Sequence, residues 1–178
     1  PTLNDDTGVT FSFAVSDGIV APVPNTASLD ITPVNTAPVN TVPGTREVDA
    51  NTPTAIAGLS VSDVDASAGT MTTTLSVAHG TLSIASAGAA AVTGSGSATV
   101  TLSGTLAQIN ATLHAASNVV YTGAHDFFGN DTLTVTTNDN GNSGAGGALS
   151  DTDQVAIHLN THLTGTPGND SFTAPSGN

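Results

Sequence analysis

Apolar and polar residues alternate with a period of two along several short segments of the chain. These segments are 71–77, 82–84, 100–102, 133–135 and 155–159. Because successive side chains of a β-strand point to opposite faces, the alternation predicts strands that each bury one face. The apolar run 55–61 predicts another strand, and His79-Gly80 predicts a hairpin turn between 71–77 and 82–84. Clusters of Gly, Asn, Asp and Ser separate the strands at the spacing of a β-sandwich.

One segment has helical spacing instead. In segment 103–113, Leu106, Ile109 and Leu113 recur three and four residues apart, which places them on one helical face. Ser103 or Thr105 can cap the start of this helix. We therefore expect one short helix that crosses one end of the sandwich.

The chain also contains a partial internal repeat. Segments 5–35 and 130–160 each run from an Asp-Thr pair through a strand, an Asp/Gly turn and a loop to a second strand, and end on an apolar residue followed by Asn. In the first copy the strands are expected at 9–15 and 29–34. This order predicts that residues 1–36 are the last two strands of a preceding repeat. Residues 37–160 then form one complete domain, with a joint at Ala37-Pro38.

Residues 1–36 would expose one apolar face. Phe11, Phe13 and Val15 alternate on one side of the first strand. Two strands alone are marginal in water because they cannot bury both faces. This segment is expected either to dock on the complete domain or to pair through its open edges with a neighbouring repeat or another chain, and we favour the pairing because the Ala37-Pro38 joint should hold the segment in line with the domain.

Composition narrows the function classes. The chain has 178 residues, a formal net charge of -13, a single Arg, no Lys and no Cys. So few cations argue against a nucleic-acid binder and against attraction to an anionic membrane surface. No apolar run approaches the roughly 20 residues of a membrane span, so no membrane insertion is expected. The absence of Cys fits either a reducing cytosol or export by a route that forms no disulfides.

Fourteen acidic residues either keep a Thr/Ser-rich surface soluble or bind cations. Calcium prefers six to eight oxygen ligands from carboxylates, amides and backbone carbonyls. Three clusters offer such oxygens, and their loops lie at one pole of an Ig-like sandwich. They comprise Asp63 and Asp65, Asn138 and Asp139, and Asp151 and Asp153. Turn formation is the alternative role for these residues, and their convergence favours a Ca2+ site.

Two further acidic positions are expected at the opposite pole. Asp49 and Asp126 would lie there beside the joint with Asn35 and Asn40. A second calcium ion at that joint would stiffen a tandem array, although nearby Asp131 can equally cap a turn.

The C-terminal segment 165–173 approximates the nonapeptide G-G-x-G-x-D-x-U-x, which builds calcium-loaded β-rolls. Asp170 would supply half of such a site, and a neighbouring repeat would complete it.

No nucleophile elbow, zinc motif, phosphate loop or triad is present, so an enzyme is not expected. A carbohydrate-binding accessory module of a secreted enzyme is the first alternative, but sugar binding usually needs exposed aromatic platforms. Only Tyr121, Phe127 and Phe128 are grouped, and Phe128 is expected in the core. A second alternative is a subunit of a strand-donating extracellular filament.

Several motifs together resemble a known family. They are Leu59–Asp65, the helix 106–111, Tyr121-Thr122-Gly123, Phe128–Asp131 and Leu133–Val135 followed by Asp139. They are similar to the cadherin-like, Ig-like tandem repeats of large secreted bacterial adhesins of the RTX type. The resemblance implies an all-β, Ig/cadherin-like β-sandwich with one short helix, preceded by a two-strand half domain. It also implies a calcium-stiffened extender or adhesion module at the cell surface or outside the cell, exported by type I secretion.

Overall fold

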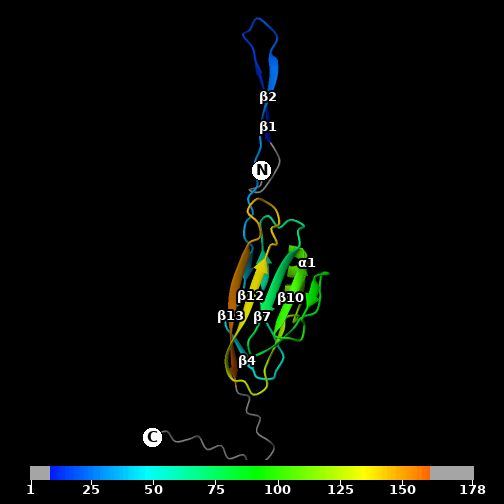
Figure 1. The fold of residues 1–178 in the computed structure, drawn as a ribbon, viewed down its shortest axis with the longest axis vertical. Coiled ribbons are helices and arrows are strands. Elements are labelled where there is room, and N and C mark those ends of the chain that lie inside the picture. The colour runs from blue at the N-terminus through cyan, green and yellow to red at the C-terminus, as the bar shows by residue number, and fades with distance from the viewer. Residues whose placement is uncertain (1–8, 161–178) are drawn as a thin grey trace, which may run out of the picture.

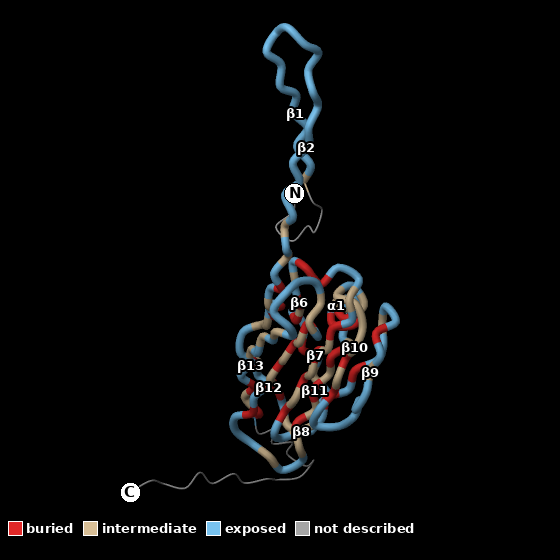
Figure 2. Tube along the Cα trace, turned by 45° about the horizontal axis from the view of Figure 1, so that its top comes forward, coloured by how far each residue is buried: buried red, intermediate tan, exposed pale blue. Residues whose placement is uncertain are grey.

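The computed structural model describes residues 9–160, and nearly half of them lie in β-strands. A hairpin of β1 (Val9–Val15) and β2 (Val23–Leu29) projects from one end of an elongated body, as Figure 1 shows. The remaining strands and the helix form that body. In Figure 2 the hairpin is exposed along nearly its whole length, whereas the body has a buried interior.

A six-stranded sheet forms one layer of the body. Adjacent strands in this sheet are antiparallel, except that β13 and β4 are parallel to each other. In spatial order its strands are β4 (Arg46–Asp49), β13 (Ser150–Asn160), β12 (Gly129–Asn138), β7 (Met71–Ser76), β10 (Thr99–Gly104) and β9 (Ala91–Thr93).

Two smaller sheets contribute the other strands. One has the order β5 (Thr54–Ala55), β11 (Val120–Gly123) and β8 (Gly80–Ser83), and the other pairs β3 (Val39–Thr41) with β6 (Ser60–Ser62). The expected all-β class is confirmed.

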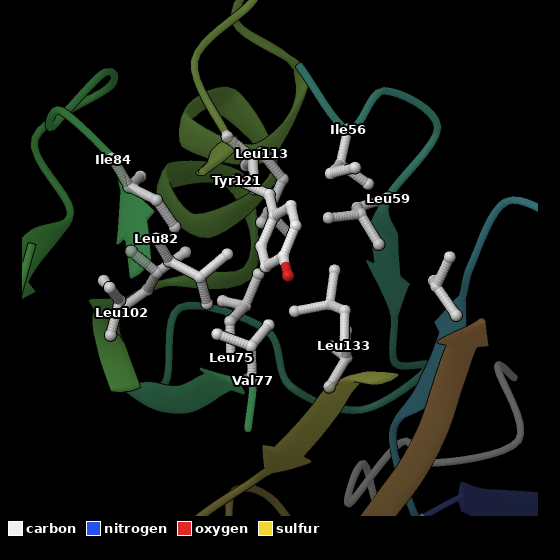
Figure 3. Close-up of a cluster of buried hydrophobic side chains, with 14 of the residues drawn as sticks. Ile56, Leu59, Leu75, Val77, Leu82, Ile84, Leu102, Leu113, Tyr121 and Leu133 are labelled. Atoms are coloured by element: carbon white, nitrogen blue, oxygen red, sulfur yellow. The ribbon is translucent and has the colours of Figure 1, made fainter. Parts of the chain in front are cut away.

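The core is one cluster contributed by all three of these sheets and the helix. Within the large sheet, Val135, Leu75 and Val100 lie side by side in register and are buried. Tyr121 from β11 is completely buried, and Figure 3 shows its ring in the middle of the labelled apolar side chains. Each such side chain stabilises the fold by about 1.5–3 kcal/mol relative to an exposed position.

The expected helix is present as α1 (Leu106–His114). Thr105 caps its start: the Thr105 hydroxyl accepts from the Gln108 N–H at 3.3 Å, and the Gln108 side chain accepts from the Thr105 N–H at 2.9 Å. This reciprocal pair satisfies two backbone donors that the first turn leaves unbonded. Ile109 and Leu113 are buried, so the helical spacing identified the correct face.

The expected hairpin at His79-Gly80 is wrong. β7 pairs with β10 and β12, whereas β8 pairs with β11 in another sheet. The chain therefore crosses between layers at residues 77–79. The Asp131 carboxylate holds this crossing by accepting the N–H groups of Ala78 and His79 at 3.1 and 2.9 Å.

Three other expectations need correction. The run 55–61 is not one strand, because Gly58 at a φ of +91° turns the chain between β5 and β6. The second strand of the hairpin is β2 rather than 29–34, because the short turn after Val15 brings Val23 directly opposite it. Phe128 is 51% exposed rather than in the core, since it lies in the loop before β12.

Candidate metal centre

The joint between the hairpin and the body is held by a glycine-rich loop. The Asn35 N–H donates to the Ala145 carbonyl at 3.0 Å, and the Ala145 N–H donates to the Pro33 carbonyl at 2.9 Å. Gly144 has a φ of +134°, and a Cβ there would lie 2.5 Å from the Asn35 nitrogen. Glycine therefore permits the close approach of loop and joint.

The side chain of Asn35 is the most informative group at this joint. It is only 6% exposed. Its Nδ2 donates to Asp139 Oδ2 at 2.6 Å and to the Gly147 carbonyl at 2.7 Å. These two acceptors fix which end of the amide is nitrogen. Its Oδ1 is buried and has no hydrogen-bond partner among the described residues, which costs about 1–3 kcal/mol unless a ligand satisfies it.

Asp63 and Asp65 form an acidic pair beside the joint. The Thr36 N–H donates to Asp65 Oδ2 at 2.7 Å, so the residue next to Asn35 contacts this pair. Asp63 Oδ1 accepts from the N–H groups of Asp65 and Ala66 at 3.1 and 3.2 Å. Burial raises the pKa of Asp63 to about 6, and the neighbouring Asp65 carboxyl adds to the rise. At neutral pH the pair therefore carries negative charge that the fold disfavours.

A hollow of about 290 Å³ lies against Asp63 of this pair. Thr36, Ala37 and Val39 line it from the joint, and Ser62, Asp63 and Val64 line it from the body. A hydrated cation therefore has an entry path to the Asp63 side of the pair.

Asp139 has a different role, because the protein already satisfies its carboxylate. Its Oδ1 accepts from the N–H groups of Gly141 and Leu149, both at 2.8 Å, and its Oδ2 accepts from Asn35. Burial alone would raise the pKa of Asp139, but these hydrogen bonds outweigh it and the net pKa lies below the usual value. Asp139 is thus a positioning residue that orients Asn35.

Asp151 also holds the joint. Its Oδ2 accepts the Asn40 N–H at 2.7 Å, and its backbone carbonyl accepts from Asn40 Nδ2 at 3.0 Å. The Asn40 Oδ1 in turn accepts from the Thr137 hydroxyl at 2.7 Å. At the joint, residues 35, 36 and 40 are therefore each bound by an acidic residue that the sequence predicts as a calcium ligand.

The other predicted ligands lie apart from the acidic pair. Asn138 bonds Ser150 across β12 and β13, and Asp153 is half-buried opposite Val135. Asp49 is exposed at the end of β4, and exposed Asp126 pairs with His125 at 2.8 Å. Asp170 lies outside the described residues.

The expected position of the joint is wrong. Asn35 and Asn40 lie at the pole of Asp65, Asp139 and Asp151, not beside Asp49 and Asp126. β13 starts next to the joint and runs the length of the body, and the parallel strand β4 places Asp49 beside Asn160 at the far end. The Asp49 and Asp126 positions therefore cannot share a site with the joint.

Sequence reasoning missed the backbone contribution of the joint. In the sequence, the run Gly144-Ala145-Gly146-Gly147 is the feature that indicates this backbone contact, because a loop of glycines permits close backbone approach. Within residues 9–160, no three His, Cys, Asp or Glu side chains gather as a metal-binding group. The candidate centre is instead two carboxylates and one amide oxygen.

Comparisons with protein-family models, with curated proteins and with solved structures found no match. In the part of the chain that the structure describes, no helix has the length and apolarity needed to cross a membrane.

Proposed function

We propose that the chain is a calcium-stiffened structural module, an extender repeat of an extracellular bacterial adhesin or a similar surface protein. The observation that carries the proposal is the buried Asn35 Oδ1, which has no hydrogen-bond partner within residues 9–160, at a joint that also contacts the Asp63–Asp65 pair. A cation bound by these three residues would join the linker to the body.

The ligand chemistry favours calcium. Carboxylate and amide oxygens suit a hard cation, whereas zinc prefers nitrogen and sulfur ligands. Calcium accepts irregular coordination by six to eight oxygens, so water and backbone carbonyls can complete a site with few side chains. Magnesium demands a tighter octahedral geometry and should bind more weakly. A bound cation would also offset the repulsion from Asp65, which adds to the rise in the Asp63 pKa that burial mainly causes.

The position of the site supports a mechanical role. An ion between the linker and the body would restrict how the hairpin moves relative to the body. An Ig/cadherin-like β-sandwich whose core lies between the large and small sheets would provide a rigid rod for such a joint. Export by type I secretion and a surface location belong to the same proposal, and they rest on the resemblance of the motifs around residues 59–65 and 121–139.

The carbohydrate-binding alternative has little support from the aromatic side chains. Tyr121 is completely buried, and Phe127 is half-buried and stacked on His79 with ring centroids 3.7 Å apart. Phe128 is then the only fully exposed aromatic of this group.

Thermal unfolding tests the calcium site. A ligand that binds only the native state stabilises it by RT ln(1 + [L]/Kd), so calcium should raise the Tm of the full chain above its value in chelator. Asp63→Asn keeps Oδ1 for the two backbone N–H groups but replaces Oδ2 with an amide, and it should remove most of this increase. Asp30→Asn makes the same change in net charge outside the site and should preserve it. Equal responses to calcium in both variants would contradict the proposed site.

A further inference from the structure

The projecting hairpin has one apolar and one polar face. Paired residues of antiparallel strands point to the same side, so the pairs Val9–Leu29, Phe11–Ala27 and Val15–Val23 share a face. Phe13 lies on this face as well, and only its partner Asn25 is polar. Phe11, Phe13 and Leu29 are 57%, 49% and 53% exposed. We call this surface the apolar hairpin face.

The hairpin β12–β13 has the same register around the same positions. Leu133 pairs with Val155 as Phe11 pairs with Ala27, and Val135 pairs with Asp153 as Phe13 pairs with Asn25. All three apolar members of these β12–β13 pairs are buried.

The turns after the two first strands also correspond. Asp17 follows Phe13 by four residues, and Asp139 follows Val135 by four. Asp17 Oδ1 accepts from the N–H two residues later, that of Ile19, at 2.9 Å. Asp139 Oδ1 accepts from the N–H of Gly141, also two residues later, at 2.8 Å. The β1–β2 hairpin is therefore a second copy of the β12–β13 hairpin that lacks a covering layer among the described residues.

The structure shows what covers such a hairpin. β12 pairs along five residues with β7, and β13 pairs in parallel with β4. Leu75 from β7 and Tyr121 from β11 belong to the same buried cluster as Leu133 and Val135. A partner for β1–β2 must therefore offer an open strand edge like that of β7 and an apolar layer behind it.

A second copy of the hairpin is too small to be that partner. Seven residues at about 3.3 Å each and two strands about 5 Å apart give a face of roughly 230 Å². Two such faces would bury roughly 500 Å², well below the ~1,200 Å² of a stable interface.

We propose that β1–β2 is a donated hairpin that completes another repeat of this kind, by adding β1 beside that repeat's β7-like strand. This proposal rests on the proposed tandem-repeat function and names the partner: an Ig-like repeat without its own closing hairpin. The donated strand adds main-chain hydrogen bonds to the open edge, and Phe11 and Phe13 fill the positions that Leu133 and Val135 fill in the complete repeat.

A complementation experiment tests this inference. The probe is the full chain carrying Leu133→Ala, which keeps every strand but weakens its own β12–β13 hairpin, and the donor is the natural full chain. Binding is measured by calorimetry, and hydrogen exchange should show new protection of residues 9–15 in the donor and 71–76 in the probe. Phe11→Asp with Phe13→Asp should weaken binding at least about tenfold, because it places charge in an apolar layer. Ser12→Asp changes the polar face and should leave binding unchanged.

A further variant tests whether the size of the Phe side chains prevents binding. Phe is larger than Leu or Val, and overpacking the slot would oppose binding. Phe11→Leu with Phe13→Val restores the volumes found in β12 and should bind more tightly than the natural sequence. Absence of binding by both the natural chain and this variant would overturn the inference. So would a dimer of the full chain that Phe11→Asp with Phe13→Asp dissociates, because a second copy would then cover the face.

All binding measurements are made both in calcium and in chelator. The calcium-induced change in Tm of the same donor is recorded separately. If the donor does not bind but calcium still raises its Tm, the hairpin inference is wrong and the proposed calcium site is unaffected. If the donor binds but calcium does not raise its Tm, the proposed calcium site is wrong and the hairpin inference is unaffected.

Discussion

Two hairpins in this chain have the same pattern of alternation, the same pairing register and the same Asp-based turn, yet their environments differ. In β12–β13 the residues Leu133 and Val155 are buried at 0% and 1% exposure, whereas Phe11 in β1–β2 is 57% exposed. Local sequence thus determines where a hairpin forms and which face is apolar. Whether that face is buried depends on strands elsewhere in the chain, here β7 and β4 at the edges of the hairpin and the sheet of β11, which contributes Tyr121 to the same core.

Truncating one side chain in each hairpin should give the largest contrast. Leu133→Ala removes buried methyl groups and leaves a cavity, so it should lower the free energy of unfolding by ~2–5 kcal/mol. Phe11→Ala removes an exposed side chain and should change it by less than about 0.5 kcal/mol. Urea denaturation of the full chain measures both values. Comparable losses would mean that the hairpin face is covered in the isolated chain.

Asp131 is a difference between the two hairpins, because β1–β2 has the apolar Val9 at the corresponding register position. The Asp131 carboxylate accepts from three N–H groups and from the Tyr121 hydroxyl, the last at 2.8 Å. Asp131→Asn presents an amide NH2 where only acceptors fit, and it should cost about 1–3 kcal/mol at neutral pH.

The pH dependence of this variant follows from the pKa of Asp131. Burial would raise that pKa, but hydrogen bonds from Thr132, His79, Tyr121 and Ala78 outweigh it and lower the net value. A carboxylate with a lowered pKa stabilises the fold above its unfolded pKa and loses this contribution as pH falls through the folded value. The difference between wild type and Asp131→Asn should therefore shrink in acid, and a gap that widens there would contradict this explanation.

Gly144 lies where the glycine-rich loop contacts Asn35, so substitutions there test whether this contact holds the hairpin to the body. Gly144→Ala places a Cβ 2.5 Å from the Asn35 nitrogen at a positive φ, and should cost about 1 kcal/mol or more. Gly147→Ala is the matched control, because Gly147 also has a positive φ but no atom within 4 Å of its Cβ. Hydrogen exchange should show faster exchange of the Asn35 N–H in Gly144→Ala than in Gly147→Ala. Equal rates would mean that the close contact does not hold the joint.

The smallest expected effect concerns Asp63. Its pKa of about 6 lies above that of an unfolded Asp, so its protonation stabilises the fold fully below the unfolded pKa, and this contribution is lost as pH rises through about 6. In chelator, stability should therefore decline between pH 5 and 7 by a small amount that Asp63→Asn abolishes. Urea midpoints at these pH values measure the change, and an equal decline in the variant would assign it to other groups.

Alternation predicted the body strands β7, β8, β10, β12 and β13, and helical spacing predicted α1, because these patterns depend on the immediate neighbours in sequence. The errors occurred where the outcome depends on distant partners. His79-Gly80 is typical of a hairpin turn, yet Asp131, more than fifty residues away, holds it as a crossing between sheets.

Site prediction had the same limit. Local clustering predicted that Asp63, Asp65 and Asp139 lie at one pole, but whether Asn35 meets them at that pole depends on the order of strands in the sheet. The division of roles could not be read from the sequence either. Asp139 and Asp63 are both acids in loops, and only their hydrogen bonds distinguish a positioning residue from a candidate ligand.

The central claim is that calcium stiffens the joint between the hairpin and the body. Because the chain has no Cys, two introduced cysteines, Ser28→Cys on the hairpin and Gln154→Cys on the body, can carry spin labels without competing sites. Pulsed electron paramagnetic resonance then measures the distribution of distances between the two labels. We expect a broad distribution in chelator that narrows when calcium is added and stays broad in Asp63→Asn. A distribution of the same width with and without calcium would contradict it.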